Sequence, residues 1–251
     1  MSGHSKWSTI KRKKAATDAK RGKVFTRIAK DLALAAREGG GDPTSNFKLR
    51  LAIDRARAAN MPKDNIDRAI RRGTGEEKGA AAFEQFYYEG YATHGVALMI
   101  EVVTDNRNRS VADVRHQLTR YGGNLGESGS VAWQFERKAY FAFAPEGRSE
   151  DDLFDLAVEA GAEDVTFETE LVEIIAPVEA FKSVSDSLEA AGIAPDEAEL
   201  RMEPTNLMQL PPADTIQVMR VIEALEELDD VRNIYSNLDV TEDAMAALEA
   251  A

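Results

Sequence analysis

The sequence predicts an α+β fold of three domains: an N-terminal helical bundle, then two ferredoxin-like mixed α/β domains, the third inserted within the second. Apolar residues recur at helical spacing as far as about residue 72, and the pattern then changes to the short apolar runs of strands. Further on, the chain contains a ββαβ set of elements, then a complete βαββαβ unit, and then an α-helix and a β-strand that would complete the first set. The predicted domains are residues 1–76, residues 77–137 together with 206–240, and residues 138–205.

Three helices are expected in the first domain. The first spans residues 17–38, with an apolar stripe on one side and a cationic ridge on the other. Residues 39–45, Gly-Gly-Gly-Asp-Pro-Thr-Ser, end that helix and can cap a second one at about 46–59. Pro62 suits a first helical position, so a third helix begins there and ends before Gly73.

A glycine-rich segment at 73–79 marks the boundary with the second domain. This domain is expected to contain strands at 86–91 and 96–103, a helix at 110–121, a glycine-rich loop at 122–129, a strand at 131–135, a helix from about Val218 to Leu228 and a strand at 231–236. The inserted domain is expected to contain strands at 139–144, near 165, near 172 and at 199–203, and helices at 150–160 and 178–191. We expect the last dozen residues to form a frayed acidic tail.

Catalytic and metal-binding signals are missing from the sequence. The chain has no Cys, which excludes disulfides and thiolate sites and fits a reducing compartment, and its three His lack ligand spacing. It has no P-loop ending, no nucleophile elbow and no recognisable carboxylate pair. No signal peptide or membrane-spanning run is found. We therefore predict a monomeric, cytoplasmic protein that is not an enzyme, with no catalytic residues, metal, cofactor or membrane contact.

Charge is divided unequally along the chain. The formal net charge is −13, yet residues 1–72 hold 19 Lys and Arg against 7 Asp and Glu, a net of +12. The remaining residues therefore carry −25. Because steering depends on where charge lies, one end of the molecule should attract a polyanion and the other should repel it.

The predicted nucleic-acid contacts lie in the first thirty residues. Flexible Lys and Arg side chains suit irregular phosphate backbones, and each neutralised phosphate releases counterions. Such contacts position a protein without reading sequence, although Trp7 can stack on an exposed base or serve as a local hydrophobic staple. The alternative is that the cations only form a solvated helix face. The predicted contacts are Lys6, Trp7, Lys11, Arg12, Lys13, Lys14, Lys20, Arg21, Lys23, Arg27 and Lys30.

Two further groups of cations have competing interpretations. In the segment 105–109, Asp or Asn can cap the following helix while Arg107 and Arg109 pair with acidic neighbours, which is the favoured interpretation. The alternative is that these two arginines make a secondary contact with RNA. At the end of the third helix, Arg68, Arg71 and Arg72 either complement the helix dipole or extend the basic surface.

Several separated motifs resemble the YebC family, from the first residues to the segment Leu228-Asp-Asp-Val231. They are Gly3-His-Ser-Lys-Trp7, Ala16-Thr-Asp-Ala-Lys-Arg-Gly-Lys23, Gly39-Gly-Gly-Asp-Pro43, Asn60-Met-Pro-Lys-Asp-Asn65, Asp105-Asn-Arg-Asn-Arg109 and Gly122-Gly-Asn-Leu-Gly126. The resemblance implies a three-domain protein without known catalysis. Family members are described as DNA-binding transcriptional regulators, mitochondrial relatives as translational activators, and bacterial ones are linked to ribosomes stalled on proline-rich sequences.

The preferred functional prediction is a translation factor that docks on ribosomal RNA and supports elongation through proline-rich sequences. The choice of ribosome over DNA rests on the resemblance and on the lack of a recognisable helix-turn-helix, zinc finger or zipper pattern. A DNA-binding transcriptional regulator is the alternative. A third hypothesis is a protein-interaction module whose ferredoxin-like domains bind partners and whose basic segment only neutralises acidic surfaces.

Overall fold

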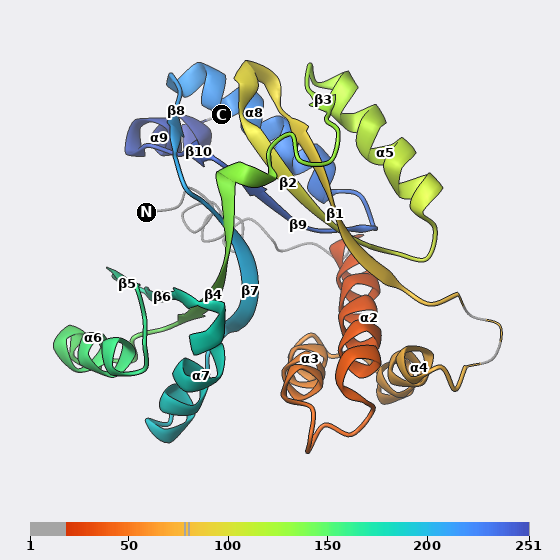
Figure 1. The fold of residues 1–251 in the computed structure, drawn as a ribbon, viewed down its shortest axis with the longest axis vertical. Helices are drawn as coiled ribbons and strands as arrows, with labels where there is room; N and C mark the ends of the chain where they lie inside the picture. Colours follow the sequence, from red (N-terminus) through yellow and green to blue (C-terminus); the bar gives the residue numbers. More distant parts are fainter. Residues whose placement is uncertain (1–18, 78, 80, 251) are drawn as a thin grey trace. The chain divides into compact units, whose positions relative to one another are not determined.

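The computed structural model describes residues 19–77, 79 and 81–250, which form an α+β fold (Figure 1). One compact unit comprises Ala132–Leu207, and a second unit contains the chain on both sides of it. The predicted architecture is confirmed: a helical bundle precedes two mixed α/β domains, and the last of these is inserted into the other.

The helical bundle consists of three helices. They are α2 (Ala19–Gly39), α3 (Phe47–Ala58) and α4 (Lys63–Thr74). Both shorter helices pack against α2 around a core that includes Leu32, Leu49 and Ile66. Asn46 fixes the turn between α2 and α3, because its side chain accepts a hydrogen bond from Leu49 N at 3.1 Å and donates to Ala35 O at 2.8 Å.

Helices α2 and α4 approach each other closely at a glycine. A Cβ atom added to Gly73 would lie 2.2 Å from the carbonyl oxygen of Ala33. Only a residue without a side chain allows the two backbones this separation.

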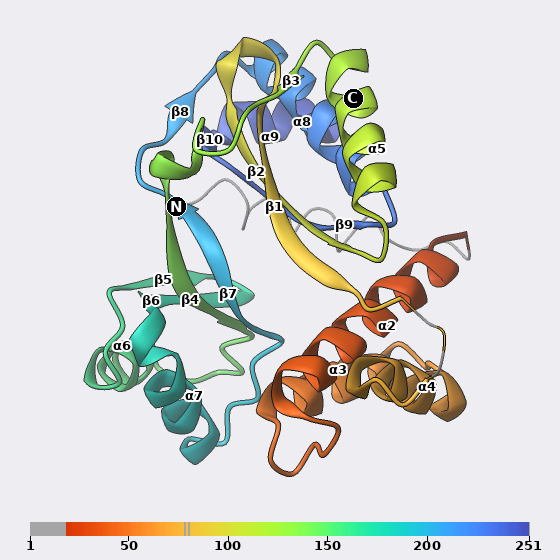
Figure 2. The same ribbon diagram turned by 45° about the vertical axis from the view of Figure 1, so that its right-hand side comes forward.

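The second domain contains a four-stranded antiparallel sheet in the order β3-β1-β2-β9. Every residue of the central strand β2 is buried, and α5 and α8 cover one face of the sheet (Figure 2). The elements are β1 (Glu84–Tyr91), η1 (Thr93–Gly95), β2 (Ala97–Thr104), α5 (Arg107–Arg120), β3 (Asn124–Leu125), β8 (Met208–Gln209), α8 (Pro212–Glu226), β9 (Val231–Ser236), β10 (Leu238–Asp239) and α9 (Glu242–Ala250).

Two expectations for this domain are wrong. The fourth strand of its sheet is β3, inside the predicted glycine-rich loop, and not residues 131–135. A strand of two residues is too short to show a period, and it pairs with β1 at Gly90, where a side chain would meet Asn124 O. The C-terminal segment is not a frayed tail either, since α9 packs on α8 and buries Ala244.

The inserted unit is a βαββαβ domain with sheet order β5-β6-β4-β7. Helices α6 and α7 pack on one face, over a core that includes Phe141, Ile174 and Leu188. Of the strand predicted at 131–135, residues 132–134 form a short 3-10 turn and only Phe135 belongs to β4, which continues through the strand predicted at 139–144 as far as Phe143. The elements are η2 (Ala132–Gln134), β4 (Phe135–Phe143), α6 (Glu150–Glu159), β5 (Asp164–Glu168), β6 (Leu171–Pro177), η3 (Val178–Ala180), α7 (Phe181–Ala190) and β7 (Glu197–Pro204).

Candidate nucleic-acid interface

Three predicted contact residues of α2 point to the end of α8. Lys23 Nζ donates to Glu227 O at 3.1 Å, the Arg27 guanidinium donates to Glu226 O, and Lys30 Nζ donates to Asp229 O at 2.6 Å. The last carbonyl groups of a helix have no partner within it and carry partial negative charge. Lys23 and Arg27 therefore cap the C-terminus of α8, and Lys30 binds the turn that follows it. Together these cations of α2 attach the helical bundle to the second domain.

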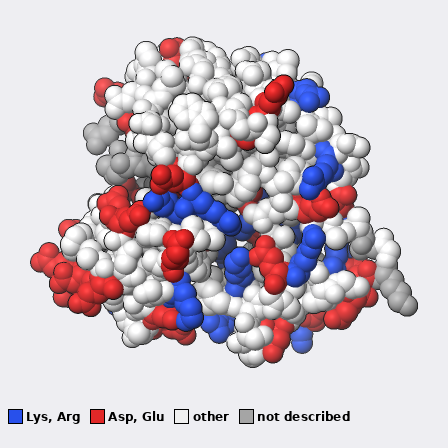
Figure 3. All heavy atoms as spheres, viewed as in Figure 1, with Lys and Arg blue, Asp and Glu red and all other residues white. Residues whose placement is uncertain are grey.

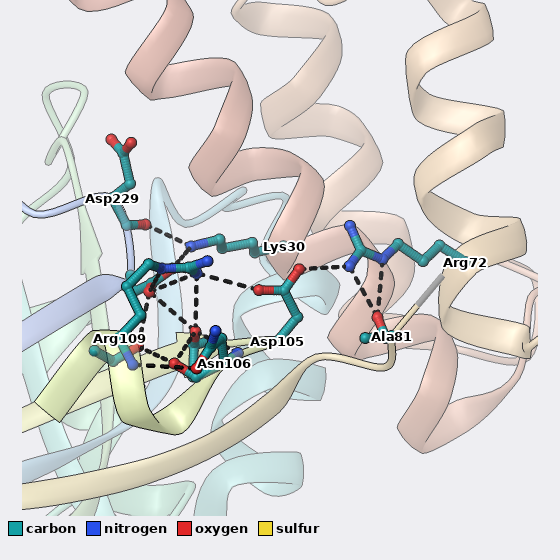
Figure 4. Close-up of polar contacts among 10 residues, drawn as sticks. Lys30, Arg72, Ala81, Asp105, Asn106, Arg109 and Asp229 are labelled. Atoms are coloured by element: carbon teal, nitrogen blue, oxygen red, sulfur yellow. Dashed lines mark hydrogen bonds and ion pairs between the residues drawn. The ribbon is translucent and has the colours of Figure 1, made fainter. Parts of the chain in front are cut away.

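Asp230 is the centre of this attachment, and Figure 4 labels Lys30 and Arg109, two of the residues that bind it. Its side chain accepts hydrogen bonds from Lys30 Nζ at 2.7 Å, from Thr104 Oγ1 at 2.9 Å and from Ser110 Oγ at 2.7 Å. Arg109 Nη2 donates to the same carboxylate at 2.8 Å. Lys30 and Asp230 are each only 7% exposed, so their ion pair lies away from solvent.

These contacts change the acidity of Asp230. Burial alone would raise the pKa, but hydrogen bonds from Lys30, Ser110 and Arg109 outweigh it and lower the pKa of Asp230 from 3.8 to about 2.

The shift predicts a loss of stability in acid. A carboxylate whose pKa is lowered in the folded state stabilises the protein at pH values above its unfolded-state pKa. This contribution is lost as the pH falls through the folded-state pKa. We expect the difference in free energy of unfolding between the wild type and Asp230→Asn to shrink by about 2 kcal/mol between pH 5 and pH 2. Urea titrations at successive pH values measure this difference. The contributions of all other carboxylates cancel in it, because both proteins contain them. A difference that stays constant with pH would contradict the assignment.

Arg107 and Arg109, the possible secondary contacts in the segment 105–109, form ion pairs within the protein. Asn106 caps α5 by accepting a hydrogen bond from Arg109 N at 3.1 Å. Arg109 also pairs with Asp105, which in turn accepts a bond from Arg72 of α4 at 3.0 Å. Arg107 pairs with Glu84 at 2.6 Å. The favoured interpretation of this segment, helix capping and ion pairing, is therefore what the structure shows.

A second polar connection joins α2 to the sheet. Arg232 of β9 pairs with Asp31 at 2.9 Å and with the buried Glu101 of β2 at 2.9 Å. Burial raises the pKa of Asp31, although the Arg232 guanidinium opposes the shift. Ion pairs from both α2 and α4 thus hold the bundle to the second domain.

The predicted contact residues fall into three groups. Lys30 does not belong to an exposed cationic ridge, because Asp230 and the end of α8 cover it. Helical periodicity identifies a polar face but cannot tell which part of the chain covers that face. Lys20 and Arg21 belong to α2, but the structure describes only their backbone. The predicted contacts that lie outside the described residues are Lys6, Trp7, Lys11, Arg12, Lys13 and Lys14.

Helix α4 carries exposed cations that the main prediction left out. Lys63, Arg68 and Arg71 fall within an arc of about 140° at 3.6 residues per turn, opposite the buried residues of the helix. None of the three forms an ion pair or hydrogen bond through its side chain with another described residue. Asp64 and Asp67 share this face, and Figure 3 shows blue and red side chains alternating on the bundle. Acidic side chains instead gather over α6, at the lower left of that view.

Within residues 19–77, 79 and 81–250, no helix is long and apolar enough to cross a membrane. The same residues contain no cluster of three or more His, Asp or Glu that could hold a metal ion.

Comparisons with known proteins agree with one family along the chain. Residues 5–76 match the TACO1/YebC protein N-terminal domain, and residues 83–238 match the TACO1/YebC second and third domain. Relatives named probable transcriptional regulatory protein, from Chlorobaculum tepidum and Acidithiobacillus ferrooxidans, are each 51% identical over 250 residues and 99% of their own length. The crystal structure of a conserved hypothetical protein from Aquifex aeolicus is 42% identical, with a TM-score of 0.82 over 90% of this chain and 93% of that one. The chain therefore belongs to the TACO1/YebC family.

Proposed function

We propose that this protein regulates gene expression by binding nucleic acid, that its target is RNA at the ribosome, and that it acts without catalysis. The observation that carries the proposal is that three exposed cations of α4, Lys63, Arg68 and Arg71, have no side-chain partner among the described residues, within a region whose first 72 residues carry a net charge of +12. Lys23, Arg27 and Lys30 are occupied by the second domain, so the exposed cations of α3 and α4 are the described groups best suited to phosphate.

The acidic remainder of the chain supports a one-sided contact. Residues 73–251 carry a net charge of −25, and three of the acidic groups occupy the first turn of α6. A surface of this sign repels phosphates. The protein would therefore bind along the helical bundle, with the α/β domains turned toward protein components of the translation machinery.

Duplex DNA is the second candidate target. The relatives are named probable transcriptional regulatory proteins. In addition, only residues 59–62 separate α3 from α4, which is a connection of the length found in helix-turn-helix motifs. Both observations favour a test in which RNA and DNA are compared directly.

Removing three exposed cations should weaken binding in a salt-dependent way. The variant Arg50→Gln, Lys63→Gln and Arg71→Gln keeps the bundle core intact, since all three side chains are exposed. If each contacts a phosphate of a single strand, the slope of log affinity against log salt should flatten by about 2. Fluorescence anisotropy with labelled single-stranded RNA and duplex DNA, between about 50 and 200 mM salt, measures the slope.

The matched control removes three exposed cations from the acidic part of the chain, in the variant Arg115→Gln, Arg120→Gln and Arg137→Gln. Equal slopes for the two variants would contradict a contact along α3 and α4. Ribosome co-sedimentation then tests the target, together with a variant in which Lys11, Arg12, Lys13 and Lys14 become Ala. Retention on duplex DNA without ribosome pelleting would favour transcription.

A further inference from the structure

A pocket of about 370 Å³ lies between α2 and α4 and is closed on one side by the segment that leads to β1. Its volume is in the range of small-ligand sites. The α2 side supplies Phe25, Thr26 and Lys30, while the α4 side supplies Asn65 and Arg68. The remaining lining residues are Ala29, Met61, Ala69, Arg72, Glu77 and Phe83.

The walls combine aromatic rings with a fixed guanidinium. Arg72 lies over the ring of Phe83, 3.7 Å from its centroid, and the ammonium of Lys30 lies 5.9 Å from the same ring. Arg72 also donates to Ala81 O at 2.8 Å and to Asp105 at 3.0 Å, so its position is defined from three sides (Figure 4). Aromatic rings and guanidinium planes are the surfaces on which proteins stack unpaired bases.

Two polar groups of the pocket remain available for a ligand. Asn65 and Arg68 are one turn apart on α4, and neither side chain is hydrogen-bonded to another described residue. An amide can donate to and accept from the edge of a base, and a guanidinium can bind phosphate. Arg68 is also exposed, so it can reach a backbone that passes outside the pocket.

We propose that the pocket between α2 and α4 receives one unpaired base of an RNA strand, with Asn65 bonding the base edge and Arg68 the adjacent phosphate. The proposal rests on the proposed function and adds to it, because surface cations alone hold a strand without selecting its structure. A pocket that receives one base requires a single strand, since bases in a duplex are stacked and paired.

Photocrosslinking tests this placement. The probe is an oligouridylate of about 12 nucleotides, within the site size of single-strand binders, with 5-iodouracil replacing one base. Irradiation of its complex with the full chain, followed by mass spectrometry, should place the crosslink on Phe25 or Phe83. Pairing the probe with oligoadenylate should abolish this crosslink, and uridine monophosphate at the concentration of the probe should not compete with it.

A substitution that changes no charge distinguishes the contribution of the pocket from that of the exposed cations of α4. Asn65→Leu should lower crosslinking at these two phenylalanines about tenfold while the salt slope of binding stays that of the wild type. Leucine favours helix more than asparagine does, so α4 should remain folded, and Asn65→Gln should restore part of the yield. The matched control is Asn108→Leu, an exposed asparagine of α5, which should change nothing.

The outcomes distinguish the two proposals. Crosslinks elsewhere in a complex with a normal salt slope would overturn the pocket and leave the proposed function standing. Equal crosslinking of the paired probe, or full competition by the mononucleotide, would also overturn the pocket as a site for a base within a strand. A chain that binds no RNA at any salt concentration would overturn both proposals.

Discussion

Replacing Asp230 with alanine is expected to lower the free energy of unfolding by about 3 to 5 kcal/mol, because it leaves the buried Lys30 ammonium without its counter-charge. The same change removes the acceptor of Thr104 and Ser110, which lie inside the protein. Urea-induced unfolding followed by circular dichroism measures the loss. Hydrogen exchange of amides in α2 and β9 should place it where the bundle meets the second domain.

The neighbouring residue provides the control. Asp229 is exposed, and Lys30 contacts only its main-chain carbonyl, so Asp229→Ala should change stability by less than about 0.5 kcal/mol. Combining Asp230→Ala with Lys30→Met should recover part of the loss, because the unpaired charge is then removed as well. A loss of less than about 1 kcal/mol for Asp230→Ala would show that the ion pair does not stabilise the protein.

Alanine at Gly73 should separate α2 from α4. The new methyl group would lie 2.2 Å from Ala33 O, and neither atom can rotate away because both are fixed to helical backbones. We expect a destabilisation of about 2 to 3 kcal/mol, after a gain of about 1 kcal/mol from the better helix propensity of alanine. Thermal unfolding monitored by circular dichroism should show a lower midpoint.

Gly22 of α2 is the matched control, since an added Cβ there meets nothing within 4 Å. Gly22→Ala should therefore stabilise the protein by up to about 1 kcal/mol. If Gly73→Ala destabilises the protein and Gly22→Ala stabilises it, the loss at Gly73 is due to the close packing of α2 against α4. If both variants were stabilised, α2 and α4 would not be in close contact in solution.

Long elements with a clear period could be predicted from the sequence, and irregular ones could not. Helices α2 to α4 follow from apolar spacing, from the glycines and proline after α2 and from Pro62. The insertion follows from counting elements. The strand β3 was missed because two residues carry no alternation, and α9 because a short helix rich in alanine and glutamate resembles a polar tail.

The site was predictable only in part, for a different physical reason. The basic segment and the arginines at the end of α4 can be identified from charge alone. Whether a cation is free depends on contacts across the chain, and Lys30 meets a carboxylate 200 positions away. No local pattern reports such a partner. The segment Leu228-Asp-Asp-Val231 stands among the family motifs, but its sequence does not indicate what it binds.

The position of the insertion affects the order in which the chain can fold during synthesis. Its ends lie side by side, because Phe135 pairs with Pro204 and Thr205 N donates to Gln134 O at 2.8 Å. The inserted unit can therefore fold completely before β9 leaves the ribosome. Strand β2, in contrast, cannot pair with β9 until the later part of the chain has been synthesised. At about 5 to 20 residues per second this delay is on the order of 10 s. During that interval the newly made bundle lacks Asp230, so the buried ion pair that attaches Lys30 of α2 to the second domain cannot yet form.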